Sequence, residues 1–246
     1  MKALIKHFKI QLLMDIRNKS TLLTFYIIPL LFYAVMGAVF SSIQPAMRQT
    51  LGASISIFAI TMGAVLGIPP SLVNMRESGT LRAYRVSGVP GWSVLLTKSA
   101  SAFINLLVVA MIIFFTAPIF FKAGIPVNMP AFFITLVLLI MVSIIIGVMI
   151  GVLAKNQSMA TILSQLVFLP SLMLAGIMFP STMLPGALQW LGRVLPASHA
   201  MESFRGWSFG LESGISPLTA NAVMVGIGLI GIIVAIMRFK KISMEN

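Results

Sequence analysis

Few residues in this chain could carry out acid–base, nucleophilic or metal chemistry. The chain has only five acidic residues and two histidines: Asp15, Glu77, Glu202, Glu212, Glu245, His7 and His199. They cannot form a His-Glu-x-x-His motif or an acidic metal cluster, so we expect no catalytic residue and no metal site. Because no Gly-Lys dipeptide occurs, the chain also lacks a Walker A loop. If ATP drives this protein, another polypeptide must bind it.

The segment with the most varied chemistry is Asn74–Lys98, which is basic and turn-rich and lies between two long apolar runs. Its first residue can cap a turn with Glu77 three positions later, Gly79 permits a sharp change of direction, and Thr80 can cap a second turn. We expect a short helix that presents arginines, Tyr84 and one carboxylate to a soluble partner. A solvated basic loop that only sets membrane topology is the alternative.

The composition indicates that membrane helices position this segment. Hydrophobic residues make up 59% of the chain, charged residues make up 9%, and the mean hydropathy is +1.04. Soluble domains carry about 25% charged residues. The net charge of +12 comes from basic residues at the edges of apolar runs, so we expect membrane lipids, and no nucleic acid, as partners. The chain has no cysteine, which excludes disulfides.

Six charge-free apolar stretches are long enough to cross about 30 Å of hydrocarbon as helices. Helices are expected because barrel strands would alternate apolar with polar residues. The fold class is therefore an all-α polytopic membrane protein, with a single membrane domain over residues 1–246. We place the spans near residues 22–40, 51–72, 99–121, 131–153, 159–179 and 215–237.

The basic residues predict how the spans are oriented. Thirteen Lys and Arg residues fall on the side of the two termini, and four fall on the other side. Both termini and Asn74–Lys98 are therefore expected in the cytoplasm, with the chain as a multi-pass protein of a prokaryotic plasma (inner) membrane. Lys98 is taken to lie just outside the third span. A signal peptide is a poorer reading of the first span, because its apolar core exceeds the usual length of about 7–15 residues.

Two further elements flank the spans. Within residues 1–19, apolar side chains recur at helical spacing among lysines, which is typical of an amphipathic helix lying along the inner leaflet. A basic lead-in that only sets topology is the alternative. The loop Pro180–Gly214 contains two apolar pieces, and Ser198 can cap the second. Short outer re-entrant helices, or a packed surface loop, would explain this pattern.

The interiors of the six predicted spans contain no charged residue, which argues against a proton-coupled carrier. Their polar groups are neutral. Hydrogen bonding between helices would account for most of them. Four remain candidates for lining a substrate pathway: Thr61, Asn105, Gln165 and Asn221.

The order of these features resembles the membrane subunits of ABC-2 type transporters. The run Glu77-Ser78-Gly79-Thr80-Leu81 is similar to the family's E-x-G-T-L motif, where a coupling helix between spans two and three contacts an ATPase subunit. The N-terminal segment is similar to the family's interfacial helix. The proline-containing loop before the sixth span resembles its outer re-entrant helices. Many relatives are richer in Glu around the motif, whereas arginines dominate here.

This resemblance implies the permease subunit of an ATP-binding cassette exporter, with an amphipathic substrate such as a drug, antibiotic, lipid or glycan. It implies a separate ABC ATPase that binds ATP and Mg, and a second permease subunit in a homo- or heterodimer. The implied ATPase-coupling residues are Arg76, Glu77, Gly79, Thr80, Leu81, Arg82, Tyr84 and Arg85. A non-transporting membrane anchor or assembly factor, and an ion-coupled carrier, are the alternatives.

Overall fold

The computed structural model describes residues 2–43, 45–177 and 183–245, and it describes side chains for residues 8–42, 47–84, 86–177 and 183–239. The described residues form helices and short connections, with no strand among them. Six helical stretches are long and apolar enough to cross a membrane, so the predicted all-α polytopic fold is confirmed. They are Lys19–Ser42, Leu51–Glu77, Gly91–Phe121, Met129–Leu153, Gln157–Leu174 and Pro217–Phe239.

The first and second spans contain π turns (η1 and η3), a third π turn (η5) follows α11, and a 3₁₀ turn (η2) follows the first span. The elements occur in the order α1 (Lys2–Arg17), α2 (Lys19–Leu22), η1 (Leu23–Ile27), α3 (Ile28–Ile43), η2 (Pro45–Arg48), α4 (Leu51–Met62), η3 (Gly63–Gly67), α5 (Ile68–Glu77), α6 (Thr80–Val86), α7 (Gly91–Phe121), α8 (Met129–Leu153), α9 (Gln157–Leu174), α10 (Gly186–Gly192), α11 (Pro196–Ser203), η5 (Phe204–Ser208) and α12 (Pro217–Glu245).

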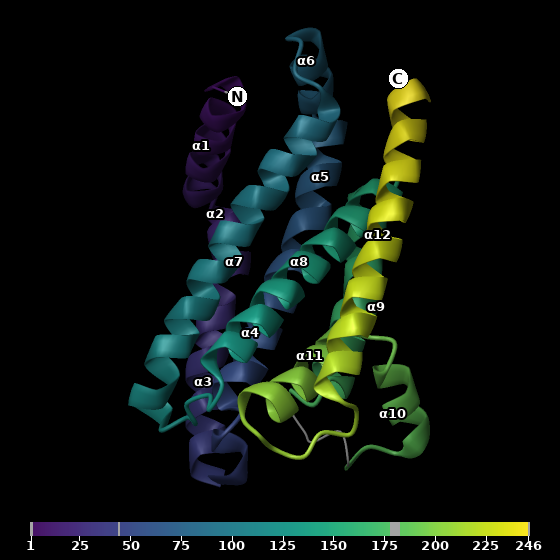
Figure 1. Ribbon diagram of the computed structural model, residues 1–246. Helices are drawn as coiled ribbons and strands as arrows, with labels where there is room; N and C mark the ends of the chain where they lie inside the picture. Colours follow the sequence, from purple (N-terminus) through teal and green to yellow (C-terminus); the bar gives the residue numbers. More distant parts are fainter. Residues whose placement is uncertain (1, 44, 178–182, 246) are drawn as a thin grey trace.

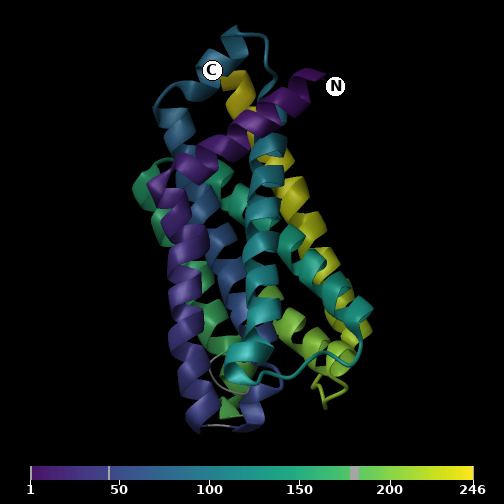
Figure 2. The ribbon, with the colours of Figure 1, turned by 90° about the vertical axis from the view of Figure 1, so that its left-hand side faces the viewer.

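The two ends of the helix bundle carry different elements. Both chain termini and α6 lie at one end, which we call the terminal end, and α10 and α11 lie at the other, which we call the opposite end (Figure 1). Figure 2 shows α1 slanting across the terminal end before the chain turns down into α3. The terminal end therefore carries the predicted interfacial helix and the predicted docking segment together.

The centre of the bundle is occupied by α4 and η3. Every residue of α4 except Gly52 is buried. Helix α8 can approach this centre closely because Gly147 has no side chain: a Cβ there would clash with the carbonyl oxygen of Ala64. At Gly151, a Cβ would lie 2.9 Å from the Cδ1 atom of Leu72. The two glycines therefore let the backbone of α8 pack closely against η3 and α5.

Two of the π turns come just before prolines in the first and second spans. A proline lacks an amide hydrogen, and its ring crowds the carbonyl group four residues earlier. For Pro29 that carbonyl belongs to Phe25 in η1, and for Pro69 it belongs to Val65 in η3. The wider π turn offers these prolines room within an otherwise continuous helix.

The helix boundaries differ from the sequence expectation in three places. Helix α7 begins at Gly91 rather than at residue 99, so Lys98 lies within the helix of the third span and not in the loop before it. Helix α5 continues to Glu77, so Asn74 lies within it and caps nothing. No glycine or proline occurs between Pro70 and Gly79, which explains the extension. Helix α9 ends at Leu174, before the predicted end of the fifth span at residue 179.

Candidate functional site

The segment predicted to dock a soluble partner forms a tight helical hairpin, α5 followed by α6. The turn depends on Gly79, whose φ of 72° lies in the left-handed region that favours glycine. The Gly79 carbonyl accepts a hydrogen bond from the Ala83 amide at 3.0 Å, so Gly79 caps α6 and Thr80 is its first residue. The Ser78 and Thr80 hydroxyls, 2.8 Å apart, share a second hydrogen bond across the turn.

Arg76 points back toward the bundle. Its guanidinium donates hydrogen bonds to the backbone carbonyls of Ala154 and Lys155, the latter at 3.0 Å. These carbonyls belong to the short turn between α8 and α9. Arg76, which the family resemblance implies is an ATPase-coupling residue, thus fastens the hairpin to the turn between the fourth and fifth spans.

The outward surface of the hairpin carries charged and apolar side chains. Glu77 and Arg82 are exposed, and Val86 is 84% exposed. Helix α6 contacts α5 and α7, and three of its side chains are half-buried: Thr80, Leu81 and Tyr84. The side chain of Arg85 lies outside the described residues. Glu77, Arg82 and Val86 therefore form the surface that a docking protein would meet first.

A buried ion pair lies beside the hairpin, between α1 and α7. The Nζ atom of Lys98 is 2.6 Å from Oδ1 of Asp15. The second carboxylate oxygen of Asp15 accepts a hydrogen bond from Ser101 at 2.7 Å, and Gln11 donates to Oδ1 at 3.0 Å. The carboxylate is thus fully hydrogen-bonded, as a buried charge requires.

The polar network continues one turn further along α7. Asn105 donates to the Ser101 carbonyl at 2.8 Å and accepts a hydrogen bond from the Tyr26 hydroxyl at 2.6 Å. Asn105, predicted as pathway-lining, is therefore occupied in joining η1 to α7. Lys98, Ser101 and Asn105 recur at spacings of three and four residues. This spacing, together with the single acidic residue of α1, is the sequence signal that could have identified the network.

The other three predicted pathway residues lie on separate helices. Thr61 on α4 and Asn221 on α12 are buried, and their side-chain polar atoms have no hydrogen-bond partner among the described residues. Gln165 on α9 is exposed beside apolar side chains. None of these residues lines the apolar cavity of the next paragraph. The side chains of Thr61 and Asn221 have no hydrogen-bond partner among the described residues, whereas that of Asn105 bonds to Ser101 and Tyr26.

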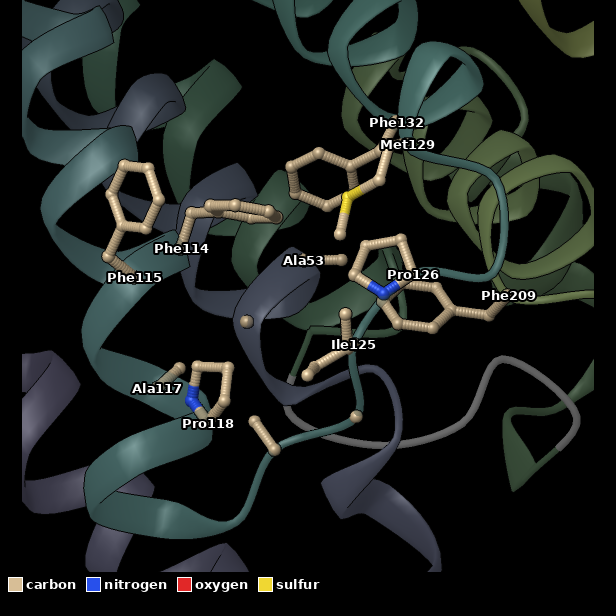
Figure 3. Close-up of a pocket in the computed structure, with 13 residues that line it drawn as sticks. Ala53, Phe114, Phe115, Ala117, Pro118, Ile125, Pro126, Met129, Phe132 and Phe209 are labelled. Carbon is tan, nitrogen blue, oxygen red and sulfur yellow. The ribbon is translucent and has the colours of Figure 1, made fainter.

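An apolar cavity of about 290 Å³ lies between α4, the end of α7 and the start of α8. In Figure 3 the rings of Phe114, Phe132 and Phe209 surround the hollow, Pro126 approaches it from the connecting loop, and Met129 approaches it from the start of α8. Phe115 and Ile125, at its border, are more than half exposed. A cavity of this size and chemistry suits a hydrocarbon chain or another apolar group.

Two short helices, α10 and α11, lie in the loop where the sequence predicted short outer re-entrant helices. Leu195 is the N-cap of α11, so Ser198 lies in its first turn instead of capping it. Residues 178–182, which include the predicted end of the fifth span and the start of the predicted loop, lie outside the described residues.

Comparison with known families agrees with the predicted membrane-protein class. The sequence profile described as ABC-2 type transporter matches residues 5–209, which run from α1 to just past η5. The chain belongs to the ABC-2 type transporter family. Membrane subunits of this family are generally non-catalytic and work with an ABC ATPase. A search of curated proteins finds no match to this chain.

Proposed function

We propose that this chain is the permease subunit of an ATP-binding cassette exporter whose separate ATPase binds ATP and Mg and docks on the α5–α6 hairpin. The observation that supports the proposal most directly is the position of α6 at the terminal end, where it extends past the neighbouring spans with Glu77 and Arg82 exposed (Figure 1). A solvated loop would not need the two carbonyl contacts of Arg76.

The contacts of the hairpin offer a route for movement into the membrane. Helix α5 is continuous with η3 and α4, and α6 contacts α7. If two ATPase chains move together on binding ATP, a displacement of α6 would therefore be transmitted to the second and third spans. Arg76 would carry the same displacement to the turn between α8 and α9.

The arrangement of charge favours a cytoplasmic terminal end and an amphipathic substrate. The terminal end carries most of the basic residues, as the positive-inside rule requires of a cytoplasmic face in the inner membrane. The centre of the single bundle is filled by α4. We therefore place the pathway between two permease subunits, identical or different. The apolar cavity could hold the apolar part of a drug, antibiotic, lipid or glycan conjugate.

Affinity purification in mild detergent tests this function, because an ABC ATPase should co-purify with the chain. Arg82→Glu places a repulsive charge at the docking surface, and we expect it to weaken ATPase binding about tenfold or more. Glu77→Gln should weaken it less. Lys122→Gln, an exposed basic residue at the opposite end, is the matched control and should have no effect. Purification of the chain without an ATPase, or unchanged transport by both hairpin variants, would overturn the proposal.

A further inference from the structure

A second cavity, of about 300 Å³ and lined by both charged and apolar groups, opens at the opposite end of the bundle. It lies between the end of α9, the α10–α11 pair and the loop before α12. Four charged side chains line it: Arg193, Glu202, Arg205 and Glu212. Two are basic and two are acidic, so their charges balance.

These four side chains form no ion pair with one another or with any other described residue. Instead, the Arg205 Nε atom donates to the backbone carbonyl of Glu212 at 3.2 Å, and Glu202 accepts the Gly214 amide at 2.7 Å. The guanidinium of Arg193 lies over the ring of Trp190, 4.9 Å from its centroid. Both guanidinium groups and both carboxylates thus keep capacity for a ligand.

The cavity also contains an unsatisfied buried imidazole. His199 is only 4% exposed, and its Nε2 atom lies 2.7 Å from the carbonyl oxygen of Arg193. Since a carbonyl oxygen can only accept, Nε2 carries the hydrogen, and Nδ1 of the neutral ring is an acceptor. Nδ1 has no partner among the described residues, and neither does the buried hydroxyl of Ser198 beside it. Buried polar atoms normally have partners, so a donor from a ligand would complete this site.

We propose that this cavity binds the headgroup of a phospholipid that carries both a phosphate and a primary ammonium group, as phosphatidylethanolamine does. Arg193 and Arg205 bind the phosphate, because guanidinium groups match its geometry and charge. Glu202, Glu212 and the Nδ1 atom of His199 accept the N–H groups of the ammonium. A quaternary ammonium such as choline has no N–H group, so the same three acceptors discriminate against it.

The surroundings of the cavity favour a membrane lipid over a free phosphorylated amine. Helix α10 and the turn after it present strongly exposed apolar side chains, with Trp190 at 70% and Val194 at 72% exposure. Tryptophan is enriched at headgroup depth, where its ring contacts acyl chains and its N–H group meets water. On the orientation proposed above, the headgroup belongs to the outer leaflet. The lipid class itself follows from the cavity and does not depend on ATPase coupling.

Native mass spectrometry of the purified chain tests the assignment. The probes are dioleoyl-phosphatidylethanolamine, its N-methyl, N,N-dimethyl and choline analogues, and dioleoyl-phosphatidylglycerol, each added at the same concentration. We expect binding to fall as N–H groups are replaced, with the choline and glycerol lipids about fivefold or more weaker than phosphatidylethanolamine. Glu212→Gln and Arg193→Gln should each reduce phosphatidylethanolamine binding about three- to tenfold, since each removes one charge-assisted contact in a partly solvated site.

Lys122→Gln is the control, because it removes a basic residue at the same end but outside the cavity. It should bind phosphatidylethanolamine as well as the unaltered chain does. Thermal unfolding in detergent checks that each variant is folded. Glu212→Gln should disturb folding least, because the Glu212 side chain makes no hydrogen bond to a described residue. Equal binding of the ethanolamine and choline lipids, or full binding by both cavity variants, would overturn the proposal. Competition by soluble O-phosphoethanolamine without a preference among the lipids would overturn the assignment to a lipid. Loss of ATPase docking would bear only on the proposed function.

Discussion

Lys98 of α7 and Asp15 of α1 form an ion pair 2.6 Å long in which each side chain is more than nine-tenths buried. This contact determines which face of α1 meets the bundle. Gln11 and Asp15 are buried against α7, whereas Ile10, Leu13 and Met14 are exposed. The polar side of α1 therefore faces the protein and its apolar side faces outward, which is the arrangement we propose for a helix lying in the membrane interface.

Replacing one partner of this ion pair should destabilise the chain more than replacing both. Asp15→Asn leaves a buried ammonium without a counterion, and Lys98→Met leaves a buried carboxylate, so each should cost about 3–5 kcal/mol. The double variant Asp15→Asn/Lys98→Met should recover much of that loss, since no buried charge remains. Thermal unfolding in detergent measures the effect, and Lys9→Gln, an exposed charge on α1, is the control. Additive losses in the double variant would show that the two charges do not stabilise each other.

The contact of α8 with η3 should be intolerant of even one added methyl group. Gly147→Ala places a Cβ against the backbone carbonyl of Ala64, which cannot move without shifting η3. We expect a loss of about 1–3 kcal/mol in the free energy of unfolding. Gly226→Ala is the matched control, because a Cβ there meets nothing within 4 Å and alanine favours the helix. If both variants unfold at the same temperature, the close approach at Gly147 is not required for stability.

The sequence predicts the number and type of the spans because their signal is long and local: about 20 apolar residues without charge. It misplaces the start of the third span, because Lys98 reads as the edge of a loop until its partner is known. That partner, Asp15, lies on another helix, and no local pattern connects the two. The same limit explains Arg76, whose contacts with the α8–α9 turn are tertiary, and the polar cavity, whose residues come from four segments.

The orientation can be tested directly because the chain has no cysteine of its own. Ser87→Cys places a thiol just after α6 at the terminal end, and Val127→Cys places one in the exposed loop before α8. With both termini in the cytoplasm, an impermeant maleimide should label Val127→Cys in intact cells. Ser87→Cys should react only after the membrane is permeabilised. The reverse pattern would invert the proposed orientation and place the α5–α6 hairpin beyond the reach of a cytoplasmic ATPase.

Arg76 should affect coupling without affecting docking, because its guanidinium faces the α8–α9 turn and not the exposed side of the hairpin. Arg76→Gln removes charged contacts to two carbonyls, which should loosen the hairpin and lower substrate transport per ATP hydrolysed several-fold. Arg76→Lys should restore only part of the loss, since an ammonium on a flexible stem cannot reproduce the planar fork. ATPase affinity, measured by co-purification, should stay near that of the unaltered chain, in contrast to Arg82→Glu. A loss of affinity in Arg76→Gln with intact coupling in the remaining complex would instead mean that Arg76 contacts the ATPase itself.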